Sequence, residues 1–393
     1  MTHEPDAAAD TGRIWLYNPV MSHAAVSILA LFCVCLTAAS AEDISGGGLQ
    51  HGAYIDLSYA NDLDGIGRVP WRSKLTSNRL NQFDPNMGVV YVKKTPIARS
   101  PWGFEFGAQA GYDTDGQVPA SARLPGYSIL RYLSRANVSY HAPLGNGLDL
   151  TAGLMNSFIG YESFYAKDNP SYSRSWIADY SPYFLMGIAA GYPINDTVSL
   201  GLYLLNDFSY LADVNRQPKY GAQVAWNFAP QWKLTQNLFL GPEQTHTAIR
   251  YWRAFSNTIL QWSDEEWTAA LAYDAGTEQL ADDASHLQSL WMGGALFTRW
   301  HIAGPWSVAL RPEFYWDPNG RMTGSQQLIK AVTATVEYKI PVGRSSLAMR
   351  AEYRYDHSSG KQGGFFVPGR GGASLEPGQN TFFFACLWAY EAP

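Results

Sequence analysis

The chain has 393 residues, of which 16% are charged and 14% aromatic, and its formal net charge is −6. The small charge and the lack of a long basic run argue against a nucleic-acid partner. The mean hydropathy of −0.19 resembles that of a soluble protein, but it does not exclude a membrane barrel, because a barrel strand averages an apolar and a polar face.

The first 41 residues predict an export signal. Residues 24–41 form an apolar run that ends in Ala39-Ser40-Ala41, which is typical of a secretory signal cleaved after Ala41. Met21 is then the expected start, with residues 1–20 as upstream sequence; the alternative is an uncleaved helical anchor. Cleavage leaves one domain over 42–393 and Cys386 as the single cysteine, so no intramolecular disulfide is expected.

The remainder predicts an all-β fold, a transmembrane antiparallel up-and-down β-barrel of about 16 strands. In the stretch Leu347–Tyr355, apolar and polar residues alternate with the period of a strand. Closure is expected because unpaired backbone groups are too costly in hydrocarbon. In chain order the predicted strands lie near 53–60, 87–94, 102–112, 129–140, 147–156, 183–192, 198–206, 218–228, 232–240, 249–262, 266–274, 290–302, 306–317, 328–340, 346–356 and 381–390.

The connections between these strands alternate between short and long. Turn-like segments include 192–196, 227–231, 263–265 and 301–305, whereas 61–86, 157–182 and 357–380 are among the long ones. Short periplasmic turns and long outer loops are typical of outer-membrane barrels. An even strand number then places both termini in the periplasm.

The alternation also assigns the inward face. Placing Arg or Lys on the lipid face near the midplane would cost about 2–4 kcal/mol each, so the charged side chains of the strands are expected inside. The aromatic residues Trp291 and Phe297 also point inward and suggest a sugar-binding track, unless the register shifts locally. The pattern predicts a wet, charged lumen, with these candidate wall residues: Arg131, Arg135, Arg299, Arg311, Glu313, Arg350, Glu352 and Arg354.

The third long loop, 157–182, is the candidate for narrowing the lumen. A barrel of this size is too wide for its wall side chains to fill. The loop carries Phe164, Trp176 and Ile177, which a freely solvated loop would not need. It is therefore expected to fold against the barrel wall, although it could instead form an outer cap.

The middle of the chain resembles the type 2, OmpL-like family of β-barrel porins. The resemblance covers about residues 150–250 and rests on Gly160-Tyr161-Glu162, Asn169, Tyr172-Ser173-Arg174-Ser175, Pro182, Gly187, Tyr192-Pro193-Ile194-Asn195-Asp196, Asp213-Val214-Asn215 and Gly241-Pro242-Glu243-Gln244. Asn206-Asp207-Phe208 departs from the family pattern. The resemblance implies passive diffusion but names no solute.

The leading functional hypothesis is a porin whose selectivity is set by pore width and facing charges. The constriction candidates are Glu162, Lys167, Asp168, Arg174 and Asp179 of the third loop, opposed to the wall arginines. An alternative for the wall residues is structural: Arg311 with Glu313, and Arg350 with Glu352 and Arg354, would satisfy neighbours across strands.

Two other function classes remain open. A surface adhesin or receptor would act through the long loops, and an outer-membrane hydrolase would need a site such as His246 with Ser256. No cofactor is expected; a Ca²⁺ site at Asp62 with Asp64, or at Asp113 with Asp115, is the alternative to solvated turn residues. The expected partners are outer-membrane lipid, small polar solutes or ions, the barrel-assembly machinery, which would read the terminal aromatic Tyr390, and a second copy of the chain.

Overall fold

The structure is a computed structural model that describes residues 48–65, 71–114, 127–209, 211, 215–244, 250–281, 288–367 and 374–392. The predicted signal segment, Asp115, Asp213, Val214 and His246 lie outside these ranges. Within them, no helix combines the length and the apolar character needed to cross a membrane.

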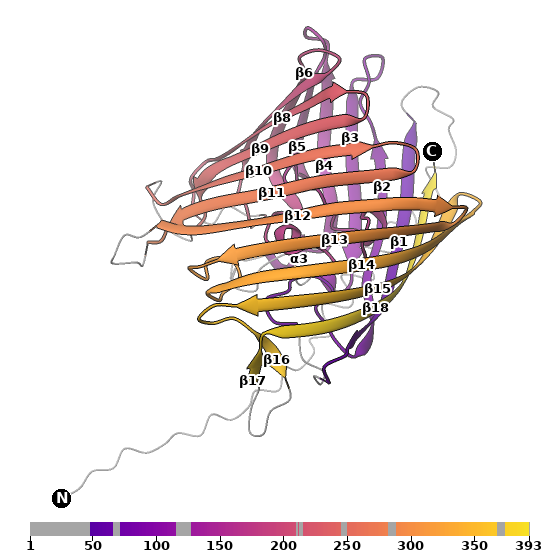
Figure 1. Ribbon diagram of the computed structural model, residues 1–393. Helices are drawn as coiled ribbons and strands as arrows, with labels where there is room; N and C mark the ends of the chain where they lie inside the picture. Colours follow the sequence, from indigo (N-terminus) through magenta and orange to yellow (C-terminus); the bar gives the residue numbers. More distant parts are fainter. Residues whose placement is uncertain are drawn as a thin grey trace, which may run out of the picture. The chain divides into compact units, whose positions relative to one another are not determined.

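Sixteen antiparallel strands form a closed barrel in which β1 pairs with β18 (Figure 1). This confirms the predicted fold class and strand number. Each strand pairs with its neighbours in the chain, as an up-and-down barrel requires. The barrel strands are β1 Leu49–Asp62, β2 Gln82–Lys94, β3 Trp102–Ala110, β4 Leu133–Ala142, β5 Leu148–Asn156, β6 Phe184–Pro193, β7 Val198–Leu205, β8 Lys219–Ala229, β9 Trp232–Pro242, β10 Trp252–Ser263, β11 Trp267–Gln279, β12 Gln288–Ala303, β13 Trp306–Asp317, β14 Gln327–Val342, β15 Ser345–Ser359 and β18 Gly378–Ala392.

The connections divide the barrel into a short-turn end and a long-loop end. At the short-turn end, only residues 230–231, 304–305 and 343–344 join β8 to β9, β12 to β13 and β14 to β15. The longer connections carry the remaining elements: α3 Tyr127–Leu130, η2 Ala166–Asp168, α4 Trp176–Asp179 and the hairpin of β16 Phe365–Val367 and β17 Ser374–Glu376.

The outer surface of the wall is apolar and carries an aromatic belt. Leu271 and Ile188, in the middle of their strands, are each 52% exposed, as expected for side chains that contact lipid. The rings of Trp267 and Trp300 stack 5.3 Å apart beside the short turns. The same level of the wall carries Trp102, Tyr140, Trp226, Phe228, Trp232, Trp262, Trp306 and Tyr338. Aromatic residues favour the membrane–water interface, so this belt marks one boundary of the apolar band.

The inner surface is charged, as predicted, but the part of it beside the third loop is packed and not wet, unlike the expectation. Arg311, Glu352 and Arg354 are fully buried, and Trp291 and Phe297 are 0% and 1% exposed. The third loop packs against Arg311, Glu352, Arg354 and Phe297, and Trp71 of the connection from β1 to β2 also covers Arg354. Trp291 packs against Arg253 of β10. The alternation along the strands predicts which charged side chains point inward, but not which of them the loops cover.

Candidate functional site: the barrel interior

The third loop (residues 157–182) crosses the interior of the barrel. It turns at Gly160, whose φ of 95° is readily adopted only by glycine. The backbone N–H of Gly160 donates to Asn257 Oδ1 on β10 at 3.1 Å, and the ring of Tyr161 lies 4.6 Å from that of Phe297 on β12. These strands lie across the barrel from β5, so the loop is not an outer cap.

The middle of the loop is fixed to β15. Glu352 accepts hydrogen bonds from the backbone N–H groups of Tyr172 at 2.5 Å and Ser173 at 3.0 Å. Arg350 donates to the carbonyl oxygens of Ala166 at 2.8 Å and Ser171 at 3.0 Å. Two wall side chains thus satisfy loop backbone groups that would otherwise be buried without partners.

Buried ion pairs join the loop to both the wall and the neighbouring loops. Arg311 Nη1 lies 2.9 Å from Glu162 Oε1, and Arg174 Nη2 lies 3.0 Å from Asp113 Oδ2 in the connection from β3 to β4. All four side chains are 2% exposed or less. A buried charge needs such a partner, because removing it from water costs on the order of several kcal/mol per ion.

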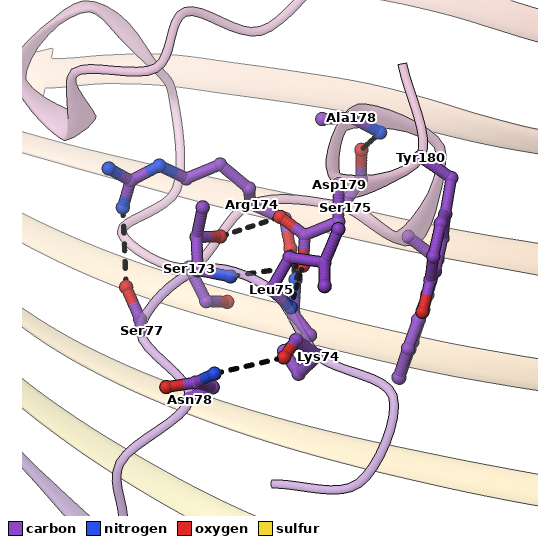
Figure 2. Close-up of polar contacts among 12 residues, drawn as sticks. Lys74, Leu75, Ser77, Asn78, Ser173, Arg174, Ser175, Ala178, Asp179 and Tyr180 are labelled. Carbon is purple, nitrogen blue, oxygen red and sulfur yellow. Dashed lines mark hydrogen bonds and ion pairs between the residues drawn. The ribbon is translucent and has the colours of Figure 1, made fainter. Parts of the chain in front are cut away.

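Asp179 joins the third loop to the first long connection, residues 71–79 (Figure 2). Its carboxylate pairs with the Lys74 ammonium group and accepts from Thr76 Oγ1 at 2.6 Å and from the Leu75 N–H at 3.1 Å. Burial alone would raise the pKa of Asp179, but the charge and hydrogen bonds of Lys74 outweigh burial and hold this pKa below its usual value. The carboxylate is therefore ionised across the neutral range.

Apolar side chains complete the packing. Trp176 is fully buried, its ring meets Trp71 edge-on, and its Nε1–H donates to Asp356 Oδ1 at 2.6 Å. A side-chain Cβ on Gly293 of β12 would lie 2.6 Å from Ile177 Cγ2, so the wall makes room for the loop at this glycine. The predicted folding of the apolar third loop against the wall is confirmed.

The candidate site residues separate into a buried and a partly exposed group. The buried group is held in ion pairs and hydrogen bonds, so its members do not meet a solute in this conformation. For the wall residues among them, this agrees with the alternative of a structural role. The buried group comprises Glu162, Arg174, Asp179, Arg311, Glu313, Arg350, Glu352 and Arg354. The other five keep contact with solvent: Lys167, Asp168, Arg131, Arg135 and Arg299.

Two of the wall arginines have partners on neighbouring strands. Arg350 of β15 pairs with Glu337 of the adjacent strand β14 at 2.7 Å. Arg354 lies 3.1 Å from Glu313 and 2.8 Å from Asp356.

The first connection is also part of the site, although the sequence pattern did not predict it. Lys74 and Thr76 hold Asp179, and Asp56 of β1 accepts from the Tyr172 hydroxyl at 3.0 Å. Trp71 gave a usable signal: a large aromatic residue in a long loop indicates burial, the same argument that identified the third loop.

Comparison with known proteins identifies the family. The sequence profile of the family described as Putative beta-barrel porin-2, OmpL-like, matches residues 48–389. The chain belongs to this family. The protein is therefore an integral outer-membrane β-barrel of a porin family, in contact with lipid. Among functionally curated proteins, no sequence matches the chain.

Solved structures of other porins share the fold. The outer membrane channel DcaP of Acinetobacter baumannii has a TM-score of 0.57 and 10% identity, over 89% of this chain and 99% of that one. OmpT, an outer membrane protein of Vibrio cholerae, has a TM-score of 0.55 and 10% identity, over 89% and 100%. The anion-selective porin from Comamonas acidovorans has a TM-score of 0.51 and 9% identity, over 87% and 99%. At such identities these matches show the architecture alone.

Proposed function

We propose that this protein is a porin through which small polar or charged solutes diffuse passively, along a water-filled path narrowed by the third loop. The observation that carries the proposal is the position of this loop: it crosses the interior of a closed sixteen-strand barrel and is fixed to the wall on several sides. A barrel of this size without an internal segment would pass solutes with little discrimination.

The charge selectivity follows from the partly exposed group. Four of its five members are cationic, Arg131, Arg135, Lys167 and Arg299, and one is anionic, Asp168. Lys167 lies 2.8 Å from Asp168, so this pair partly cancels. Arg299 is also paired, with Glu337 at 2.6 Å. Arg131 and Arg135 then give the path a positive potential, and we expect a weak preference for anions.

The arrangement in the cell is part of the same proposal. Cleavage after Ala41 would release a mature chain of residues 42–393 with its short turns and both termini in the periplasm. The domain assignment, an upstream segment with a signal at 1–41 and one barrel at 42–393, rests on the sequence. The protein would act as a channel and not as an enzyme, and it would be inserted by the barrel-assembly machinery.

Self-association is also proposed. A trimer form of OmpT of Vibrio cholerae is among the structures that share the fold, with a TM-score of 0.55 at 10% identity over 87% of this chain and 98% of that one. Cross-linking of the protein in native membranes tests this point, with a single monomer band as the contradicting result.

Conductance measurement tests the function. The refolded mature chain is inserted into a planar bilayer with different KCl concentrations on the two sides. Discrete current steps that scale with salt, with a reversal potential favouring chloride, are expected. Silence from protein that is shown to be folded and inserted would contradict a pore, and would favour action through the outer loops.

A further inference from the structure

A cavity at the long-loop end has no assigned role. It has a volume of about 420 Å³ and is bordered by the end of the third loop, by the connection from β7 to β8 and by the connection from β13 to β14. Its size falls within the range of about 300–1,000 Å³ that small-molecule sites occupy. Because these connections meet at one mouth of the barrel, a solute entering there would pass the cavity.

Most of the cavity wall is apolar. Tyr183 and Phe184 border it where the third loop passes into β6, Phe208 and Leu211 from the connection after β7, and Met322 from the connection after β13. Phe208 also packs edge-on against Phe239 and Phe255 of the barrel wall, with ring centroids 4.9 and 5.0 Å away, which holds its ring in place. Such a surface favours a ligand with an apolar ring.

Two arginines enter this apolar wall and share one carboxylate. Arg253 Nη2 lies 2.9 Å and Arg321 Nε 2.5 Å from Glu278 Oε2. Two further carboxylates border the cavity. Glu243 accepts from the N–H groups of Phe208 and Ser209 at 2.9 and 3.3 Å and lies 3.8 Å from Arg253, and Asp179 is held by Lys74 and Thr76. The carboxylates are therefore occupied by existing donors.

Donor groups remain unused after these pairings. Arg321 is 25% exposed, and within the described ranges its two terminal nitrogens make no hydrogen bond. Arg253 Nε is buried and has no hydrogen-bond partner in the part of the chain that the structure describes. A guanidinium group presents paired N–H donors whose spacing matches a carboxylate.

We propose that this cavity binds a small organic carboxylate that carries an apolar ring, with the carboxylate on Arg321 and the ring against Tyr183 and Phe208. The inference rests on the proposed function, because the ligand would be a solute on its way through the pore. The site combines an apolar body with one anion-binding group, the combination that distinguishes an aromatic carboxylate from a simple salt ion and from a neutral ring.

Equilibrium binding tests the proposal with three probes. Isothermal titration calorimetry on the detergent-solubilised full mature chain compares benzoate with benzamide, which keeps the ring without the charge, and with acetate, which keeps the charge without the ring. Benzoate is expected to bind about tenfold or more tightly than either, because each comparison removes one class of contact. Equal binding of benzoate and benzamide, or of benzoate and acetate, would overturn the proposal.

Variants assign the binding to this cavity. Arg321→Met is expected to weaken benzoate binding about tenfold, and Arg321→Lys by less, because lysine keeps the charge but not the paired donors. Arg250→Met removes the same charge from an exposed position just before β10 and should leave binding unchanged. Equal losses in Arg321→Met and Arg250→Met, or no loss in Arg321→Met, would refute the site.

The outcome for the pore is read separately on the same preparations. Conductance without preferential benzoate binding would overturn this inference and leave the porin proposal standing. Benzoate binding that depends on Arg321, in a protein that carries no current, would support the site and overturn the proposed diffusion pathway.

Discussion

At the scale of single residues, the interior is held by carboxylates with several donors each. Asp179 accepts from Lys74, Leu75, Thr76 and Tyr183, which come from both the first connection and the third loop. Such a group links two segments that are about a hundred residues apart in the chain. Its loss should free both segments together, while the barrel strands keep their own hydrogen bonds.

Asp179→Asn tests this link. The change leaves the Lys74 ammonium group buried without its counter-ion, which should destabilise loop docking by about 3–5 kcal/mol. Amide hydrogen exchange over residues 172–181 should rise strongly in the variant and stay slow in the strands. Asp196→Asn, at an exposed turn position, is the matched control and should leave exchange unchanged; equal exchange in Asp179→Asn and the wild type would contradict the link.

The same residue predicts how docking responds to acid. The Lys74 partner holds the pKa of Asp179 below its usual value, so its stabilisation is present above that usual value and is lost as pH falls through the lowered pKa. The pKa of Asp113 shifts in the opposite direction. Burial raises this pKa, so protonation of Asp113 is favoured in the folded state.

Pepsin digestion checks the acid response. The third loop should resist cleavage at pH about 4, near the usual pKa of Asp, and become sensitive only at lower pH. Asp179→Asn should lack this acid step and be sensitive throughout. Cleavage of the wild-type loop that begins well above pH about 4 would show that Asp179 does not control docking.

At the scale of elements, the strands were predictable and the interior pairings were not. Each predicted strand overlaps one barrel strand, because the period-two alternation is repeated along the whole chain. The apolar residues of the third loop also predicted its burial. The partners of Glu162 and Lys74 lie 149 and 105 residues away in the sequence, and no local pattern encodes contacts of that separation.

A charge on the lipid face tests the assignment of the two faces. Leu271 lies in the middle of β11 and is 52% exposed. Leu271→Arg should lower the free energy of unfolding in lipid by about 2–4 kcal/mol, whereas Ile302→Arg, near the end of β12, should cost about 0–1 kcal/mol. Reversible urea unfolding in vesicles measures both variants, and equal costs would contradict the proposed membrane depth.

At the scale of the whole molecule, the barrel wall and the internal loop together form the interior surface. The wall gives a lipid-facing surface and a ring of inward charges, and the loop covers the charges on one side. Arg311, Arg350 and Arg354 are all paired or capped by loop atoms. The account therefore predicts that the loop controls both the width of the path and the number of cationic side chains that a solute meets.

The most direct test compares single-channel conductance of the wild type with a variant in which residues 163–179 are replaced by a short Gly-Ser linker. The account predicts a larger conductance in the variant and a weaker discrimination between anions and cations, because the lumen widens and the three solvated arginines keep their wall partners Glu313, Glu337 and Asp356. Folding is verified by the retained β-sheet circular dichroism signal and by insertion into the bilayer. Unchanged conductance and selectivity in a folded, inserted variant would contradict the claim that the third loop narrows the path.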